Sequence, residues 1–418
     1  MKKSLTTFAL LCAVASAAGA QESPAPKKPS MVCTDGVCVE TPPPAPKSPS
    51  VGYEAGNGLQ YKSATDTVTL YGLLDITLST IDNADAVGDR KTGYQVSWFS
   101  GDRWGITGKH LFDTGPEKFG VAFKLESEYV LNTGEMDTPG VLFNRDAWIG
   151  FESETLGLVH FGRQNTLARD FSQNYGDPYG SAEVRLDEGG WTNTNNFKQL
   201  IFYAGSVTGT RYDNGLVWKK KFGEYIVAGL GYQFGEVAGD FMKNTTESAA
   251  LAFNGKIVNV SGYFTHANVN GNDLQSFSVG ANVEVIPQYL RVGGGYFGYW
   301  ADQGAVGRRK DNCFTVSAKL STGTPVDLEA GYQVMKASNF GLTKAGNQAN
   351  PFADASAATK AGNGDKKTFY ASIFYRFDRR AEVYLAGDYM TLSGDYKLAV
   401  NNRFGDQTEL AAGLRFRF

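Results

Sequence analysis

An alternation of apolar and polar residues, repeated along most of the chain, constrains its fold more than any other feature. The last twelve residues, QTELAAGLRFRF, place Leu410, Leu414 and Phe416 on one parity and every charge on the other. Successive side chains of a β-strand point to opposite faces, so this segment predicts a strand with one apolar and one charged face. From Thr67 onward the chain contains sixteen alternating segments, many of about ten residues. That is the length of a tilted strand that crosses a bilayer.

The connections between these segments distinguish a membrane barrel from a soluble sandwich, whose strands can show the same alternation. Seven short turns interleave with eight longer loops rich in Gly, Asn and Asp. The short turns are predicted at 113–118, 153–155, 221–224, 254–256, 286–288, 322–325 and 378–380, and the longer loops at 80–93, 132–140, 164–210, 235–246, 268–273, 301–311, 337–365 and 393–406. An up-and-down barrel with short periplasmic turns and long external loops predicts this sorting, and a sandwich does not. We therefore predict an all-β chain that forms a 16-stranded antiparallel transmembrane β-barrel over residues 67–418.

The segment before the barrel carries signals of export. Lys2 and Lys3 precede an apolar run that ends in Ala18-Gly19-Ala20, which predicts a secretory signal peptide over residues 1–20. Residues 21–66 are rich in proline, which favours extended and solvated backbone, so we expect a periplasmic leader. Within it, Cys33 and Cys38 are separated by four residues, and an oxidising periplasm could join them in a small disulfide loop. A metal site is not expected there, because no histidine completes the ligand set.

Several stretches resemble the general diffusion porins of Gram-negative outer membranes, especially the betaproteobacterial type. The matching stretches are TVTLYGLLD from residue 67, DRWGITGKHLFDTG from 102, FKLESEY from 123, LFNRDAWIGFESETLGLVHFGRQ from 142, RYDNGLVW from 211, and the terminal Phe418. The resemblance implies a homotrimer in the outer membrane, surrounded by lipid and lipopolysaccharide, in which a third external loop folds into the channel. It also implies that the assembly machinery recognises Phe418. The long leader departs from the family pattern, because the mature barrel usually starts almost at once.

The same resemblance suggests where small hydrophilic solutes and ions would cross a narrow part of the channel. The family places arginines on the barrel wall, and the matching positions are Arg103, Arg145 and Arg211. The third loop, 164–210, carries the acidic residues that would face them: Asp170, Asp177, Glu183, Asp187 and Glu188. Opposed rows of charge across a wet gap would create a transverse field, although ordinary salt bridges that brace the loop would use the same residues. Leu73 stands where the family often has a lysine, so anion preference does not carry over directly.

Other functional classes find less support in the sequence. An enzyme needs a catalytic constellation, but the histidines are only His110, His160 and His266, and no Gly-flanked serine motif accompanies them. No cofactor is predicted, and the formal net charge of -3 argues against a nucleic-acid partner. Two alternatives stay open: a channel specific for one solute, and a barrel that anchors a surface, cell-wall or adhesive function.

Overall fold

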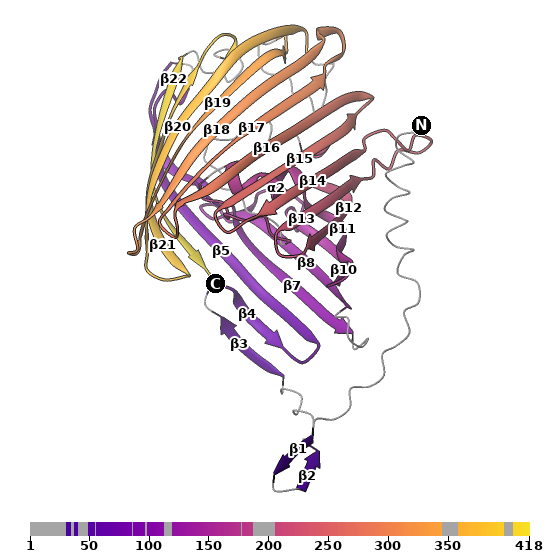
Figure 1. Cartoon of the computed structure of the whole chain (residues 1–418). Helices are drawn as coiled ribbons and strands as arrows, with labels where there is room; N and C mark the ends of the chain where they lie inside the picture. Colours follow the sequence, from indigo (N-terminus) through magenta and orange to yellow (C-terminus); the bar gives the residue numbers. More distant parts are fainter. Residues whose placement is uncertain are drawn as a thin grey trace.

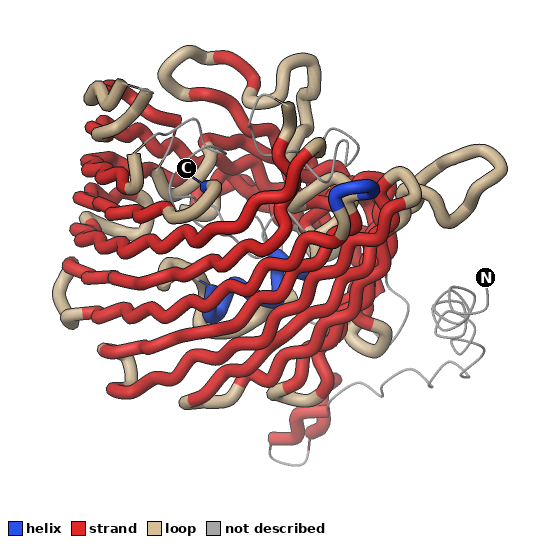
Figure 2. Tube along the Cα trace, turned by 90° about the horizontal axis from the view of Figure 1, so that it is seen from above, coloured by secondary structure: helices blue, strands red, loops and turns tan. Residues whose placement is uncertain are grey.

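The computed structural model is a closed β-barrel. It describes residues 31–34, 37–40, 49–54, 56–85, 87–96, 98–112, 119–176, 178–186, 205–344, 358–396 and 404–418. Sixteen strands pair with their neighbours in antiparallel order, and the last strand pairs with the first. Figures 1 and 2 show these tilted strands side by side around the molecule. The predicted fold class and strand number are therefore confirmed.

The barrel strands follow the chain in order. They are β5 (Asp66–Ile81), β7 (Asp102–Phe112), β8 (Phe119–Val130), β10 (Asp146–Ser153), β11 (Gly157–Asn165), β12 (Arg211–Phe222), β13 (Ile226–Gln233), β14 (Thr246–Asn254), β15 (Val258–Val269), β16 (Asn272–Ile286), β17 (Leu290–Asp302), β18 (Arg308–Ser321), β19 (Val326–Leu342), β20 (Lys360–Arg376), β21 (Ala381–Leu392) and β22 (Asp406–Arg417). Two short strands add to the sheet: β6 (Lys91–Val96) pairs with β5, and β9 (Glu135–Met136) pairs with β8.

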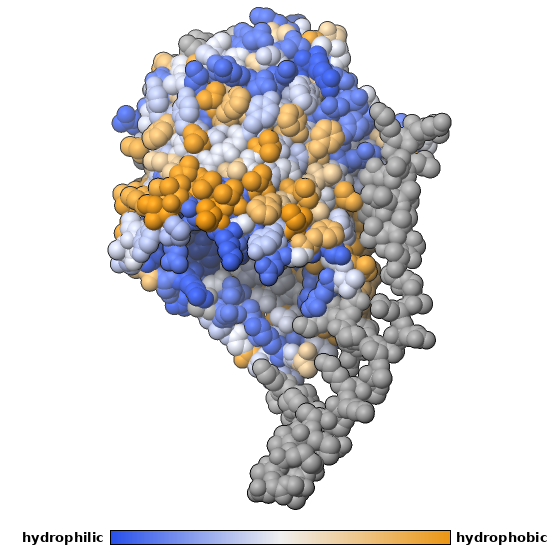
Figure 3. All heavy atoms as spheres, in the orientation of Figure 1, coloured by the Kyte–Doolittle hydropathy of each residue, from blue (hydrophilic) through white to orange (hydrophobic). Residues whose placement is uncertain are grey.

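The alternation in sequence becomes an alternation between the two faces of the wall. On β18, Phe314 and Val316 are about half exposed on the outer face, while Thr315 and Ser317, which alternate with them, are buried. Figure 3 shows a belt of hydrophobic side chains across the outside of the wall, with hydrophilic side chains above it. An apolar outer face with polar residues inside is the pattern of a barrel whose solvent on the outside is lipid.

The turns at one end of the barrel lie where the sequence predicts them. Six of the seven predicted short turns connect described strands, and the seventh, 113–118, lies outside the described residues. One predicted long loop is wrong, however. Residues 268–273 are almost entirely strand, because β15 and β16 pair as far as Val269 and Asn272. Asn270 and Gly271, both at positive φ, form the tight turn between them, and this backbone matches the twist of paired strands.

The helical part of the structure is small. A 3₁₀ turn, η1 (Gly304–Val306), joins β17 to β18, and α2 (Leu167–Gly176) follows β11. The Oγ1 of Thr166 accepts a hydrogen bond from the backbone N–H of Arg169 at 3.3 Å and so caps the start of α2. Among the described residues, no helix is long and apolar enough to cross a membrane.

The leader contains two hairpins that the sequence did not predict. The first joins β1 (Met31–Thr34) to β2 (Val37–Glu40), and its register pairs Cys33 directly with Cys38. The disulfide between them stays a prediction. The second joins β3 (Ser50–Glu54) to β4 (Gly58–Lys62), and β4 pairs with the start of β5. Sheet structure therefore begins before residue 67. The expected signal peptide lies outside the described residues.

Candidate functional site

Helix α2 rests on the inner face of one half of the barrel. Figures 1 and 2 show it within the outline of the wall, and its contacts fall on the strands from β13 to β18. The amide of Asn282 on β16 donates to the backbone carbonyls of Asn174 and Ala182, at 2.6 and 2.7 Å. The hydroxyl of Ser261 on β15 donates to the carbonyl of Phe171 at 2.6 Å. These wall side chains are uncharged, and Asn282 satisfies the carbonyl of Asn174, which lies in the last turn of α2 and has no helical partner.

A single aromatic ring fits α2 closely against this wall. Tyr175 is fully buried, and its hydroxyl lies 2.6 Å from the Oγ of Ser278. A Cβ atom on Gly280 or Gly295 would lie only 2.3 or 2.4 Å from the ring. Two adjacent strands therefore carry glycine where the ring crosses them, because any side chain there would displace it.

The segment after α2 reaches the neighbouring part of the wall. The guanidinium of Arg291 donates to the carbonyls of Pro178 and Gly180, at 2.9 and 2.8 Å. The Tyr179 hydroxyl lies 2.9 Å from the Oγ of Ser372 on β20. Its ring packs edge-on against Phe99, with the centroids 4.7 Å apart. The described part of the third loop is thus attached to the wall at both of its ends.

Phe99 belongs to a short segment that leaves the wall between β6 and β7. Trp98 and Phe99 are almost completely buried. The backbone N–H of Trp98 donates to the Oγ1 of Thr77 at 3.0 Å. Besides Tyr179, the Phe99 ring contacts Phe374 and Tyr384 on β20 and β21, at centroid distances of 4.9 and 4.6 Å. These inward aromatic rings fill the interior of the barrel near the place where β22 pairs with β5.

The arginines predicted at the channel wall lie together on β7, β12 and the residue before β10. Arg145 forms ion pairs with Glu126 and Glu128 of β8. A guanidinium nitrogen of Arg103 lies 4.0 Å from the Glu126 carboxylate. The Nε of Arg211 lies 3.7 Å from an Asp146 oxygen. The three predicted arginines therefore share one cluster with carboxylates of the wall itself.

The third loop adds a positive charge to this cluster. Arg169 lies on α2 and is largely buried. Its burial, and then the positive charges of Arg211, Arg145 and Arg103, lower the pKa of Arg169 to about 9. The Arg169 guanidinium thus stays protonated at neutral pH, and four guanidinium groups interact there. Lys124 adds a fifth cation, 2.6 Å from Asp146.

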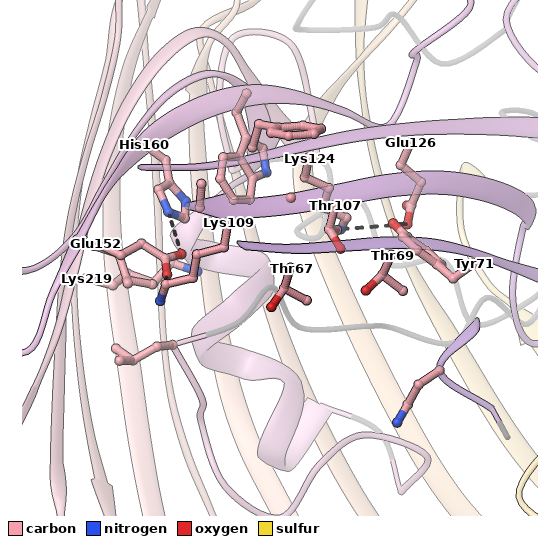
Figure 4. A pocket seen from close by; sticks show the side chains of 17 residues that line it. Thr67, Thr69, Tyr71, Thr107, Lys109, Lys124, Glu126, Glu152, His160 and Lys219 are labelled. Carbon is pink, nitrogen blue, oxygen red and sulfur yellow. Dashed lines mark hydrogen bonds and ion pairs between the residues drawn. The ribbon is translucent and has the colours of Figure 1, made fainter. Parts of the chain in front are cut away.

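A cavity of about 450 Å³ adjoins the cluster and shares Lys124 and Glu126 with it. Figure 4 shows the side chains that line it, with His160, Glu152, Lys109 and Lys219 at the left, Glu126 and Tyr71 at the right, and Thr67, Thr69 and Thr107 between them. Glu152 forms an ion pair with Lys109 at 2.6 Å and lies 3.5 Å from the Nε2 of His160. The cavity is therefore lined by paired charges together with apolar side chains such as Phe123, Trp148 and Leu158.

Comparison with known proteins agrees with this architecture. The model of the Gram-negative porin family matches residues 6–395 of the chain. The chain belongs to the Gram-negative porin family. An outer membrane porin protein of Bordetella pertussis is 26% identical over 402 residues, which cover 85% of this chain and 95% of the relative. The protein is therefore an outer-membrane channel for passive diffusion, as the sequence predicted.

Solved porin structures share the fold at low sequence identity. The anion-selective porin from Comamonas acidovorans has a TM-score of 0.62 and 17% identity, covering 84% of this chain and all of that one. A trimer form of OmpT, an outer membrane protein of Vibrio cholerae, has a TM-score of 0.57 and 15% identity, covering 85% of this chain and all of that one. At these identities the likeness shows the fold alone.

Of the acidic residues predicted for this site, the structure describes Asp170 and Glu183. Asp170 is fully buried, and its oxygens bind Lys219 at 2.6 Å and the Asn165 amide at 3.0 Å. It therefore braces the start of the loop against the wall. Glu183 is exposed. Asp177, Asp187 and Glu188 lie outside the described residues.

Sequence reasoning missed the carboxylates that the structure brings to the arginines. They are Glu126, Glu128 and Asp146, and the first two alternate with Lys124 in the stretch FKLESEY. Charges at every second position of a strand share one face, so this stretch carried a usable signal. Arg169 had no such signal, because a helix inside the barrel follows no strand parity.

Proposed function

We propose that α2 and the arginine cluster form the narrowest part of the channel, and that they favour small hydrophilic anions. One observation supports this best: the wall brings Arg103, Arg145 and Arg211 into one cluster, and Arg169 of α2 follows four residues after Asn165, which pairs with Arg211. The described cluster holds five cations, including Lys124, and three carboxylates. An excess of positive charge in a narrow, water-filled gap raises the local concentration of anions.

The proposal does not depend on the loop carboxylates that the sequence suggested. Asp170 is bonded to Lys219, so its charge is largely balanced within the wall. The field at the cluster then comes from arginines and from carboxylates that share the same strands. Arg145 combines bracing of the wall with ion preference.

Three further features of the porin are proposals. The chain is proposed to form a homotrimer, which the fold shared with a trimer form of OmpT supports. Phe418 is proposed to be the signal for the outer-membrane assembly machinery. Its backbone exchanges hydrogen bonds with Gly72 on β5 at 2.9 and 3.0 Å, so it ends the final strand at the seam. Lipid and lipopolysaccharide are proposed to surround the outer face.

Single-channel recording in a planar bilayer under a salt gradient tests the ion preference. Arg169→Gln should lower the ratio of anion to cation permeability by a few-fold, most strongly at low ionic strength, because screening acts over roughly 8 Å at physiological salt. Arg308→Gln is the matched control. Its side chain is half exposed and lies 3.5 Å from Asp302 at the far end of β18, so the ratio should not change. Three conductance steps per insertion would support the trimer.

Several results would contradict the proposal. An unchanged reversal potential in Arg169→Gln would remove the loop arginine from the selective region. Conductance that saturates with one particular solute would favour the solute-specific channel. No conductance at all would favour the anchor or adhesive role.

A further inference from the structure

The last strand, β22, closes the barrel by pairing with the first, β5, and we call this junction the seam. The seam is completed by the leader and not by β22 alone. β22 pairs with β5 from Ile81 only as far as Leu73, and Phe418 binds Gly72. Beyond that point the edge of β5 continues from Leu70 to Thr67, and β4 pairs with it there. Figure 1 shows the β3–β4 hairpin directly beyond the C-terminus, along the line of β22. The hairpin covers an edge whose backbone groups would otherwise lack partners.

The register of the hairpin aligns its apolar face with the outer face of the barrel. Leu59 lies opposite Leu70, and Tyr61 lies opposite Val68. Directly paired residues of antiparallel strands share a face. Leu70 and Val68 are exposed on the outer, lipid-facing side of β5. The apolar residues of β4 therefore continue the lipid-facing surface of the wall.

β3 widens this apolar surface by a second strand. Val51 pairs with Tyr61, and Tyr53 pairs with Leu59. The four side chains Val51, Tyr53, Leu59 and Tyr61 are exposed by 71%, 48%, 47% and 39% respectively. Exposure of contiguous apolar side chains to water is unfavourable, and such patches mark a surface that another apolar phase covers.

The opposite face of the hairpin is polar. Gln60 pairs with Thr69, a buried residue that lines the cavity inside the barrel. Lys62 and Glu54 form an ion pair at 3.7 Å. The hairpin thus repeats the division of every barrel strand into an apolar outer face and a polar inner face, which a solvated linker does not require.

Close backbone contacts hold the hairpin in this place. Gly58 has a φ of +96°, and a Cβ atom on it would lie 2.2 Å from the carbonyl oxygen of Leu70. A Cβ atom on Gly56 would lie 3.1 Å from the carbonyl oxygen of Arg379, in the turn between β20 and β21. The hairpin is therefore packed against the rim of the barrel at two points.

We propose that the β3–β4 hairpin is part of the membrane-embedded wall, and that its apolar face binds phospholipid of the periplasmic leaflet. This inference rests on the proposed lipid contact of the outer face: the apolar face of the hairpin continues Val68 and Leu70, so the same lipid would cover it. The nearby turn follows Tyr375 and Phe377, which are both exposed. Tyr53 and Tyr61 extend that aromatic rim across the seam, where tyrosine rings prefer the boundary between lipid and water.

Photo-cross-linking in the full chain tests this assignment. p-Benzoylphenylalanine is placed at Val51 or at Leu59 on the apolar face, and at Gln60 on the polar face as the matched control. Irradiation of cells should attach phospholipid to the chain at residues 51 and 59, detected by intact mass and by radiolabelled lipid, with no adduct above background at residue 60. The heat-modifiable mobility of each variant on gels verifies that the barrel has folded.

Each other outcome overturns the proposal. A covalent dimer of this chain from residues 51 and 59 would assign the face to a contact between subunits. Adducts with another envelope protein would make the hairpin a docking site. Absence of any adduct at both positions would place the hairpin in water. As a second variant, Gly58→Ala should displace the hairpin from β5 and reduce lipid attachment at Val51; unchanged attachment would show that the docked geometry is not needed.

Discussion

Two regions of the inner wall hold the third loop in different ways. The wall from β15 to β18 binds α2 itself through uncharged side chains such as Ser261, Ser278 and Asn282. Arg291 of the same wall binds only backbone carbonyls of the segment that follows α2. The wall formed by β7, β8, β10 and β12 presents arginines and carboxylates, and it meets the loop through Arg169 and Asp170. Hydrogen bonds between neutral groups act at short range, whereas charges act across the gap until salt screens them. The comparison suggests that one wall fixes the position of the loop and the other sets the ion preference.

We call the wall formed by β7, β8, β10 and β12 the charged wall. The largest expected effect comes from removing the arginine at the centre of its ion pairs. Arg145→Ala leaves Glu126 and Glu128 without their main partner. Removing one member of a buried ion pair typically costs about 3–5 kcal/mol, and we expect the lower end because water reaches the channel. The free energy of unfolding in urea should fall by about 3 kcal/mol, and the channel should become more cation-selective in bilayer recordings.

A second variant separates lost charge balance from lost packing. Adding Glu128→Gln to Arg145→Ala removes one of the unpaired carboxylates, so it should recover part of both the stability and the anion preference. If the double variant is no more stable than Arg145→Ala, the Arg145 side chain acts by filling space, and the charged wall is not held by its ion pairs.

We call the wall from β15 to β18 the neutral wall. A smaller effect is expected when a side chain of this wall that binds the loop is removed. Asn282→Ala removes the donor for the carbonyls of Asn174 and Ala182. Leaving buried acceptors without donors costs about 1–3 kcal/mol. The free energy of unfolding should fall by that amount, and single-channel current should fluctuate more because the loop is less firmly held. The reversal potential should not move.

Asn259→Ala is the matched control for this prediction. Asn259 donates to Asn282 at 3.0 Å, and both residues belong to the wall. The control therefore removes a hydrogen bond between wall residues and leaves the donors to the loop in place, so the current should stay as quiet as in the wild type. Equal noise in both variants would mean that general loosening of the wall, and not release of the loop, is responsible.

The sequence predicts the outer face of the barrel better than its interior. Alternation alone orients residues such as Phe314 and Val316 toward lipid, because every outward position meets the same solvent. Inward positions differ from one another. Phe374 and Tyr384 point inward, yet both are aromatic, because the ring of Phe99 packs against them. Strand periodicity cannot show which non-local segment covers an inward residue.

The residues of the candidate site could likewise be predicted only in part from the sequence. The resemblance located Arg103, Arg145 and Arg211, since those positions are fixed by strand parity and by short motifs. It could not foresee that Asp170 binds Lys219, 49 residues away, instead of the arginines. A partner on the neighbouring strand β12 depends on how the loop lies inside the barrel. The hairpin at residues 50–62 was missed for a related reason: its proline-rich surroundings favoured extended, solvated backbone, and its pairing with β5 is visible only once the seam is built.

The smallest expected effect tests whether the two walls are independent. Tyr175→Phe keeps the ring over Gly280 and Gly295 and removes only the hydroxyl that lies 2.6 Å from Ser278. The Ser278 hydroxyl itself donates to the carbonyl of Tyr296 at 2.8 Å, so the tyrosine is the donor to Ser278. One such hydrogen bond contributes about 0.5–1.5 kcal/mol, which should appear as a small loss in the free energy of unfolding. Conductance and reversal potential should both equal those of the wild type at low and high salt. A shift in reversal potential would show that a change on the neutral wall reaches the arginine cluster, and position and ion preference would then not be separate properties of this channel.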